Sequence, residues 1–289
     1  MKIVADSSVM LSVEQGAECG MDILPLAVTI DGRSWLEYED ITSEEFLALV
    51  RSGAMPQSSS PPPNLTLAAY DTDEEVLHLT MADGLSGAYE VACGLKAQAP
   101  HPERVCVLNS RTLCVPHRIL ALCAVELAKR CEHVVEVVSH LKPLIDSARS
   151  YLIPEDFDYL RRGGRLTPLA ATFAHLVKAA PVMHQTEDGT RLERLTIARS
   201  FKKGVDAVIA DLKGRGVGEG FYLSVSHADN AADASWAAKR LEAAFPANRV
   251  GVFELGPAFI TQGGPLCIAI QAISLGAFPN LLVHEGALP

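Results

Sequence analysis

The sequence predicts an α/β protein of two domains. At 289 residues, the chain is long enough for two domains of ordinary size. In the first half, short apolar runs alternate with helical periodicity, which is typical of a parallel sheet covered by helices. In the second half, a hairpin pattern stands among the helices and indicates a mixed sheet. We expect a three-layer α/β/α domain with a parallel sheet over residues 1–150 and a two-layer α/β domain with a mixed sheet over residues 151–289.

Strands and helices of the first half follow from the spacing of its apolar residues. Short uninterrupted runs of Ile, Val and Leu predict buried strands, and recurrence every three or four positions predicts helices. Thr42 and Glu45 form a capping box that starts one helix, and Gly53 ends it. The other predicted elements are strands at residues 2–5, 23–30, 76–81 and 105–108 and helices at residues 87–98, 118–130 and 134–147.

The second half opens with a short helix that begins after Pro154 and ends at Gly163 and Gly164. Glu187-Asp188-Gly189 is a turn signal between two apolar runs, so a hairpin is expected there. The stretch from Gly256 to Pro265 is apolar and rich in glycine, and it suits either the wall of an apolar cavity or a core strand with a bulge. The remaining predicted elements are helices at residues 169–178, 201–213 and 231–244 and strands at residues 182–185, 191–197, 221–226 and 250–255.

Composition excludes several classes of protein. The formal net charge of −10 argues against a nucleic-acid binder, which needs a basic face. The start of the chain does not resemble an export signal, and no run approaches 18 apolar residues. The seven cysteines form no C-x-x-C pair and are expected to be reduced, so a cytoplasmic location is predicted. The sequence holds neither a phosphate-binding G-x-x-x-x-G-K-[ST] loop nor metal-ligand spacing, so no cofactor or metal is expected.

Polar segments follow several of the predicted strands. In parallel sheets, ligands bind at this edge because helix N-termini present free N–H groups there. All four segments carry hydroxyl side chains, in three of them beside glycine, proline or asparagine, which suits binding of a carboxylate or phosphate by neutral donors. Single segments of this kind also cap helices and fill turns. The four segments are Asp6-Ser7-Ser8, Pro56–Pro63, Asp83–Gly87 and Asn109-Ser110-Arg111-Thr112.

Arg161-Arg162-Gly163-Gly164-Arg165 adds cations to this set. Paired glycines let the backbone turn and let another segment approach closely. Arg161 and Arg162 are accounted for by a helix C-terminus, where the dipole favours positive charge. Arg165 is left as a fixed cation that can pair with an anion.

A serine hydrolase is an alternative. Gly84-Leu85-Ser86-Gly87-Ala88 is close to the nucleophile elbow, with alanine in place of its second glycine. His227 and Asp229 are the candidate partners of Ser86. Their order along the chain, however, differs from that of the enzymes with this elbow.

These motifs together resemble the DegV family of bacterial fatty-acid-binding proteins, which includes the FakB subunits of fatty acid kinase. Its most specific signature, Y-L-(K/R)-(K/R)-G-G-R-(I/L), is intact as Tyr159–Leu166. Its D-S-(S/T), T-S-Q-P-S and L-S-G-T-Y motifs resemble Asp6–Ser8, Ser58–Pro62 and Leu85–Tyr89. Asn109-Ser110 stands where the family has D-S.

The resemblance implies a non-catalytic lipid-binding protein, the substrate-binding subunit of a kinase system. One long-chain fatty acid would lie between the two domains, and a separate ATP-dependent kinase would convert its carboxylate to an acyl phosphate. Peripheral contact with a membrane is compatible with this role. The residues implied to bind the carboxylate are Ser58, Ser59, Ser86, Gly87, Arg165 and Gln262, with Asp6, Ser7, Ser8, Asn109 and Ser110 in support.

Two departures from the family pattern leave another amphiphilic acid open as the ligand. Gln262 replaces the histidine that helps to hold the carboxylate, and Ala180 replaces a lysine. A glutamine side chain still donates a hydrogen bond but carries no charge.

Overall fold

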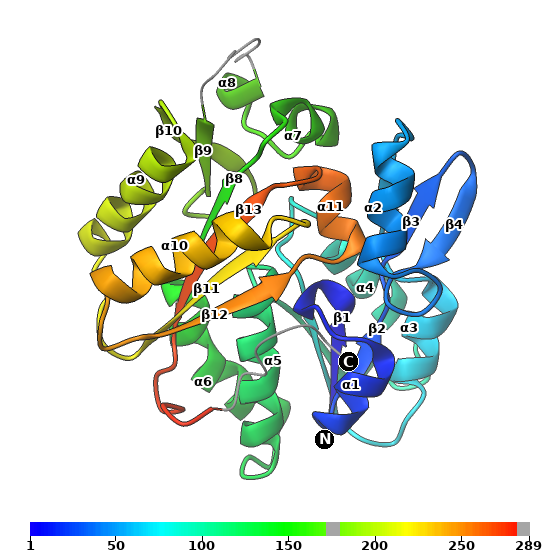
Figure 1. Ribbon diagram of the computed structural model, residues 1–289. Coiled ribbons are helices and arrows are strands. Elements are labelled where there is room, and N and C mark those ends of the chain that lie inside the picture. Colours follow the sequence, from blue (N-terminus) through cyan, green and yellow to red (C-terminus); the bar gives the residue numbers. More distant parts are fainter. Residues whose placement is uncertain (172–179, 282–289) are drawn as a thin grey trace.

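The computed structural model describes residues 1–171 and 180–281. Figure 1 shows a parallel sheet built from the N-terminal part of the chain, in blue and cyan, and a mixed sheet built from the part drawn in green to red. A third, small antiparallel sheet projects beside the parallel one. The α/β architecture with one parallel and one mixed sheet is the predicted fold class.

The parallel sheet has the strand order β2-β1-β6-β7. Its alternate residues face two different apolar clusters. Ile3 and Ala5 of β1 pack in the cluster that includes Ile119 and Leu120, whereas Val4 packs with Tyr70 and Leu95. Both faces are therefore covered by helices, and the layers are α/β/α. The strands are β1 (Lys2–Asp6), β2 (Asp22–Leu24), β6 (Val76–Thr80) and β7 (Val105–Asn109), and the helices are α1 (Val13–Glu18), α3 (Pro63–Tyr70), α4 (Ala88–Lys96), α5 (Cys114–Ala128) and α6 (Val134–Ser147).

The single strand predicted over residues 23–30 is wrong. Residues 22–24 form β2, whereas Ala27–Ile30 is β3 of the small antiparallel sheet, which has the order β4-β3-β5. Pro25 separates them, because proline has no N–H to continue a strand ladder. Asp31 and Gly32, both at positive φ, turn the chain into β4 (Arg33–Leu36). The third strand, β5 (Gln57–Ser59), brings Ser58 opposite Val28.

The mixed sheet has the order β10-β9-β8-β13-β11-β12, and only the β11–β12 pair is parallel. The predicted hairpin is confirmed as β9–β10. Helices α9 and α10 pack with one face of this sheet in a single apolar cluster, which gives two layers. The elements are β8 (Arg149–Ile153), β9 (Ala180–Gln185), β10 (Leu192–Ala198), β11 (Phe221–His227), β12 (Arg249–Glu254), β13 (Ile268–Ser274), α9 (Phe201–Gly214) and α10 (Ala231–Ala244).

Three elements of the second half, β8, α11 (Pro257–Gly263) and β13, are absent from the sequence prediction. β13 is an interior strand of the mixed sheet, between β8 and β11. The Gly256–Pro265 stretch, predicted as a cavity wall or a bulged strand, contains the helix α11, which contacts β3, β5 and α2 of the N-terminal half. A short apolar run is compatible with either a buried strand or a buried helix, so periodicity alone does not separate them.

The short helices have the predicted termini. In α2 (Ser43–Arg51), the Thr42 side chain accepts from the Glu45 N–H at 3.2 Å, and Glu45 accepts from the Thr42 N–H at 2.9 Å. In α7 (Phe157–Gly163), Asp156 caps the start, and Gly164 ends the helix at a φ of 69°. Helix α8 (Pro168–Ala171) begins the helix predicted at residues 169–178, the rest of which lies outside the described residues.

One large apolar cluster joins the two halves of the chain. It includes Leu141 of α6, Ile260 of α11 and Ile273 of β13. Helices α5 and α6 both contact β13. In the part of the chain that the structure describes, no helix is both long and apolar enough to cross a membrane.

Candidate functional site

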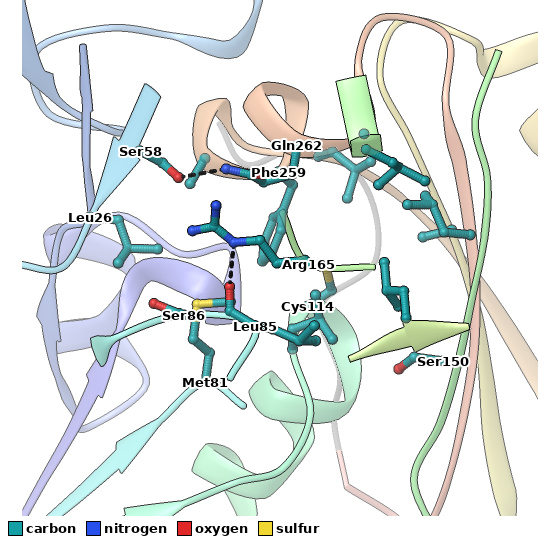
Figure 2. Close-up of a pocket in the computed structure, with 18 of the residues that line it drawn as sticks. Leu26, Ser58, Met81, Leu85, Ser86, Cys114, Ser150, Arg165, Phe259 and Gln262 are labelled. Atoms are coloured by element: carbon teal, nitrogen blue, oxygen red, sulfur yellow. Dashed lines mark hydrogen bonds between the residues drawn. The ribbon is translucent and has the colours of Figure 1, made fainter. Parts of the chain in front are cut away.

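A cavity of about 290 Å³ lies where the two halves of the chain meet (Figure 2). β5 and the loop after β6 form one side, and β8, the segment after α7 and α11 form the other. Much of its wall is apolar, and a cluster of polar groups lies at one end. The apolar lining includes Leu26, Met81, Leu85, Leu113, Leu152, Leu160, Leu192, Leu255 and Phe259.

Four predicted site residues from four different segments converge at the polar end. Ser58 lies on β5, Ser86 in the loop before α4, Arg165 after α7 and Gln262 on α11. The Nε2 of Gln262 donates to the Oγ of Ser58 at 3.1 Å. In Figure 2 the Arg165 guanidinium points toward the side of the cavity on which Ser58 and Ser86 lie. Ser59 and Gly87 also line the cavity.

The guanidinium of Arg165 is held by backbone carbonyls. Its Nε donates to the carbonyl oxygen of Leu85 at 2.9 Å, and its Nη1 donates to that of Gly163. Among the described residues, no carboxylate forms an ion pair with it. Burial, followed by the charge of Arg191, lowers the pKa of Arg165. An arginine nevertheless stays protonated in proteins, so a positive charge without a counter-charge faces the cavity.

The two glycines before Arg165, Gly163 and Gly164, have different structural roles. A Cβ atom on Gly163 would lie 2.2 Å from Oε1 of Gln262, so only glycine lets the Gln262 side chain approach this backbone. Gly164 is left-handed, at a φ of 69°, and its N–H donates to the carbonyl oxygen of Arg161. The predicted roles of the glycine pair, close approach and turning, are confirmed.

The five predicted supporting residues do not line the cavity. Asp6 is fully buried, and its carboxylate accepts from the N–H of Ser8 at 3.1 Å and from that of Met81 at 2.8 Å. Met81 is part of the cavity wall, so Asp6 positions the wall through the hydrogen bond to the Met81 N–H without lining the cavity itself. Ser8 is also fully buried, with its Oγ 2.6 Å from Nδ1 of His117.

Asn109 and Ser110 shape loops. Oδ1 of Asn109 accepts from the N–H of Asp83 at 3.2 Å and from that of Arg111 at 2.9 Å. The Oγ of Ser110 donates to the carbonyl oxygen of Thr112 at 3.2 Å. The bond between Asn109 and Asp83 ties the end of β7 to the loop that carries Ser86, and the other two bonds shape the segment after β7.

A buried carboxyl that the sequence analysis missed connects Ser7 with α11. Glu37 is fully buried, and the Ser7 hydroxyl donates to its Oε1 at 2.5 Å. The Ala258 N–H, in the first turn of α11, donates to its Oε2 at 2.9 Å. Glu37 therefore helps to position the helix that carries Gln262. Burial raises the pKa of Glu37 to about 8. Its sequence context, Trp-Leu-Glu-Tyr-Glu-Asp, mixes acidic with aromatic residues and does not indicate which of the carboxyl groups is buried.

The structure does not support the hydrolase alternative. Oγ of Ser86 accepts from the N–H of Ala88 at 3.2 Å, and Nδ1 of His227 accepts from the N–H of Asn230 at 3.3 Å. Asp229 forms an ion pair with Arg51. Of the three candidate triad residues, only Ser86 lines the cavity. Among the described residues, no group of three or more histidine, cysteine or acidic side chains is arranged so that it could bind a metal ion.

The chain matches known proteins over nearly all of its length. A family model described as an uncharacterised protein of the DegV family matches residues 1–275. A DegV domain-containing protein of Listeria monocytogenes is 25% identical over 272 residues, which are 91% of this chain and 94% of that protein. A DegV domain-containing protein of Caldanaerobacter subterraneus is 27% identical over 219 residues, 74% of this chain and 77% of that protein.

Solved structures share the fold. DegV of Bacillus subtilis, a fatty acid binding protein, has a TM-score of 0.83 at 21% identity, with 94% of this chain and 98% of that chain covered. A DegV family protein of Thermus thermophilus, described by its fatty acid binding, has a TM-score of 0.83 at 25% identity, with 94% and 99% covered. A stearic acid-binding protein of Eubacterium ventriosum has a TM-score of 0.82 at 23% identity, with 97% and 99% covered.

Glu37→Gln should change how stability depends on pH. With a folded-state pKa of about 8 against an ordinary value of 4.5, the folded wild type keeps a proton that the unfolded chain loses. The wild type should therefore lose stability as the pH rises from 4.5 to 8, by up to about 1.4 kcal/mol per pH unit. Glu37→Gln removes this loss. The unfolding free energy of the variant, measured in urea, should therefore rise relative to that of the wild type between pH 5 and pH 8. The exposed Glu219→Gln is the control, and a constant difference between Glu37→Gln and wild type would contradict the prediction.

Gly163→Ala should displace Gln262. The new Cβ overlaps Oε1 of Gln262, and moving that side chain breaks its hydrogen bond to Ser58, at a cost of about 1 kcal/mol. Gly94→Ala, in α4, meets nothing within 4 Å and should gain about 0.5–1 kcal/mol from helix propensity. Urea unfolding measures both variants. In a Gln262→Ala background the cost of Gly163→Ala should disappear, whereas an unchanged cost would show that Gln262 is not its cause.

Proposed function

The chain belongs to the DegV family, and we propose that it binds one long-chain fatty acid in the cavity between its two halves. The carboxylate lies at the end formed by Ser58, Ser86, Arg165 and Gln262, and the tail lies along the apolar wall. The observation that carries the proposal is Arg165, a half-buried cation that has no carboxylate partner among the described residues and faces an otherwise largely apolar cavity. Fatty acid binding by solved relatives supports it.

The hydroxyl groups at this end are free to donate. Oγ of Ser58 accepts from Gln262, and Oγ of Ser86 accepts from the N–H of Ala88, so each hydroxyl keeps its own proton for an acceptor in the cavity. A carboxylate offers two oxygens with about four acceptor sites. The guanidinium and the two hydroxyls therefore complement an ionised acid headgroup, and Arg165 offsets the cost of removing that charge from water.

The tail provides most of the affinity. Burying about 15 methylene groups at ~0.8 kcal/mol each gives on the order of 12 kcal/mol before the costs of association. A hydrogen bond to a charged group adds only about 1.5–3 kcal/mol. The polar cluster thus decides which end of the ligand lies where, while the apolar wall decides that a long chain binds at all.

The two domains are proposed to divide near residue 150, with the ligand at their interface. β8 begins at Arg149 and belongs to the mixed sheet, whereas α6 ends at Ser147 and packs against α5 of the N-terminal half as well as against β13. Cavity walls come from both sides of this boundary.

We further propose that the protein itself performs no covalent step. It presents the carboxylate to a separate ATP-dependent kinase of the cytoplasm. A carboxylate oxygen would attack the γ-phosphorus, forming an acyl phosphate and releasing ADP. An outer basin of about 260 Å³ supports this division of labour, because it shares Ser58, Arg165 and Gln262 with the cavity and gives access to the proposed headgroup from outside. Its remaining lining residues are Met55, Pro56, Gln57, Tyr159, Arg162, Gly163 and Thr261.

A different amphiphilic acid is the second candidate ligand. It is favoured by Gln262, which lines the cavity and stands in place of the family's histidine. Ala180, the other departure from the family pattern, does not line the cavity, so its replacement of a lysine has no direct bearing on the headgroup.

Protein purified from a bacterial host and then denatured should release about one equivalent of long-chain fatty acid per chain. Mass spectrometry of the extracted lipid measures this. Release of another amphiphilic acid would favour the second candidate. A protein that neither carries nor takes up an acyl chain would overturn the proposal.

Arg165→Gln should weaken fatty acid binding by about tenfold to a hundredfold, because one charged partner of the carboxylate is lost while the apolar wall is kept. Titration of the delipidated protein with octadecanoate measures the dissociation constant. Arg161→Gln is the matched control, since Arg161 is exposed and pairs with Asp158. Equal affinities of the Arg165→Gln and Arg161→Gln variants would show that Arg165 does not contact the ligand.

A further inference from the structure

The cavity has a second polar region. It lies at a distance from Ser58, Ser86, Arg165 and Gln262, which we call the headgroup cluster. Ser150 of β8 and Gln271 of β13 face each other across the strand pair and both line the cavity. They are 8% and 1% exposed. Figure 2 shows Ser150 across the cavity from Ser58 and Arg165. Nothing in the proposed binding of a plain fatty acid uses these two side chains.

The hydrogen bonds of this pair leave one acceptor and one donor unused. Nε2 of Gln271 donates to the carbonyl oxygen of Leu113 at 3.0 Å and to Oγ of Ser150 at 2.9 Å. Because a carbonyl oxygen can only accept, the first bond fixes which end of the amide is nitrogen. Oε1 of Gln271 is buried and has no hydrogen-bond donor among the described residues. Ser150 acts as the acceptor toward Gln271, so its own proton remains available.

A buried amide oxygen without a partner costs free energy, and native structures rarely keep one without a reason. A hydrocarbon tail has no hydrogen-bond donor for Oε1 of Gln271. A hydroxyl group offers what the pair lacks, because it donates one hydrogen bond and accepts others. It would donate to Oε1 of Gln271 and accept from the hydroxyl of Ser150.

We propose that the ligand of this cavity is a hydroxy fatty acid whose hydroxyl lies far along the chain, against Ser150 and Gln271. The inference rests on the proposed function and narrows its substrate class. Cys267 lines the cavity and contacts Gly263 of α11, next to Gln262 of the headgroup cluster, and Gln271 is four residues farther along the chain. Four residues of strand span about 13 Å, so a hydroxyl close to the carboxylate does not reach the pair.

The wild-type protein provides the decisive comparison. Delipidated full-length protein is titrated with octadecanoate, 12-hydroxyoctadecanoate and 2-hydroxyoctadecanoate, and the three dissociation constants are measured by competition. The 12-hydroxy acid should bind about tenfold more tightly than octadecanoate, while the 2-hydroxy acid should show no such gain. Equal or weaker binding of the 12-hydroxy acid would overturn the inference, and it is the result expected if a buried water already satisfies Gln271.

Two variants test the residues separately. Gln271→Leu removes the acceptor and Ser150→Ala the donor, and each should abolish the preference for the 12-hydroxy acid. The matched control is Ser224→Ala, because Ser224 is Gln271's buried partner on β11 and does not line the cavity. A preference that survives in folded Gln271→Leu would contradict the assignment. Should neither octadecanoate nor its hydroxy derivatives bind the wild type, the proposed function itself fails, whereas equal binding of all three refutes only the hydroxyl site.

Discussion

The arrangement of the site depends on keeping one guanidinium half-buried without an acidic partner. Water is the best solvent for a charge, so the protein must replace it with fixed dipoles. Two backbone carbonyls, of Leu85 and Gly163, do this for Arg165 and leave the rest of its charge directed into the cavity. A carboxylate of the protein in that place would neutralise the cation and remove its affinity for a ligand anion. Leu85 belongs to the N-terminal half and Gly163 to the C-terminal half, so Arg165 is held from both halves of the chain.

The same end of the cavity depends on contacts that are remote in sequence. Gln262 reaches Ser58 only because α11 is fixed against the N-terminal half, and Glu37 contributes through its bond to the Ala258 N–H. A ligand bound between the halves would favour the closed arrangement of all these contacts, since anything that binds only the folded state stabilises it. Binding of such a ligand would therefore be coupled to stability through α11.

The proposed function of the site is recognition of a ligand. Ser86 and His227 are engaged in separate hydrogen bonds to backbone N–H groups, which leaves Ser86 without a general base among the described residues. Selectivity in such a cavity arises from buried polar groups more than from apolar fit. One methylene more or less changes binding little, whereas a buried acceptor that a ligand leaves unpaired is penalised strongly. In the proposed site Gln271 would be such an acceptor, and Arg165 with its neighbouring hydroxyls would act by the same rule with charge added.

Local signals in the sequence determined the elements whose geometry is local. The Thr42–Glu45 capping box, the glycine end of α7 and the β9–β10 hairpin each depend on residues only a few positions apart. The motif around Arg165, together with the serine motifs and the position of Gln262, also identified the family and the residues that meet at the polar end. Tertiary structure alone decided the rest. Pro25 divides one apolar run between two sheets, an apolar glycine-rich stretch becomes α11, and β13 is placed inside the mixed sheet. The buried roles of Glu37 and Gln271 depend on partners 221 and 121 residues away. Sequence periodicity reports which face of an element is apolar, but the burial and pairing of a single polar side chain are fixed only when distant segments pack against it.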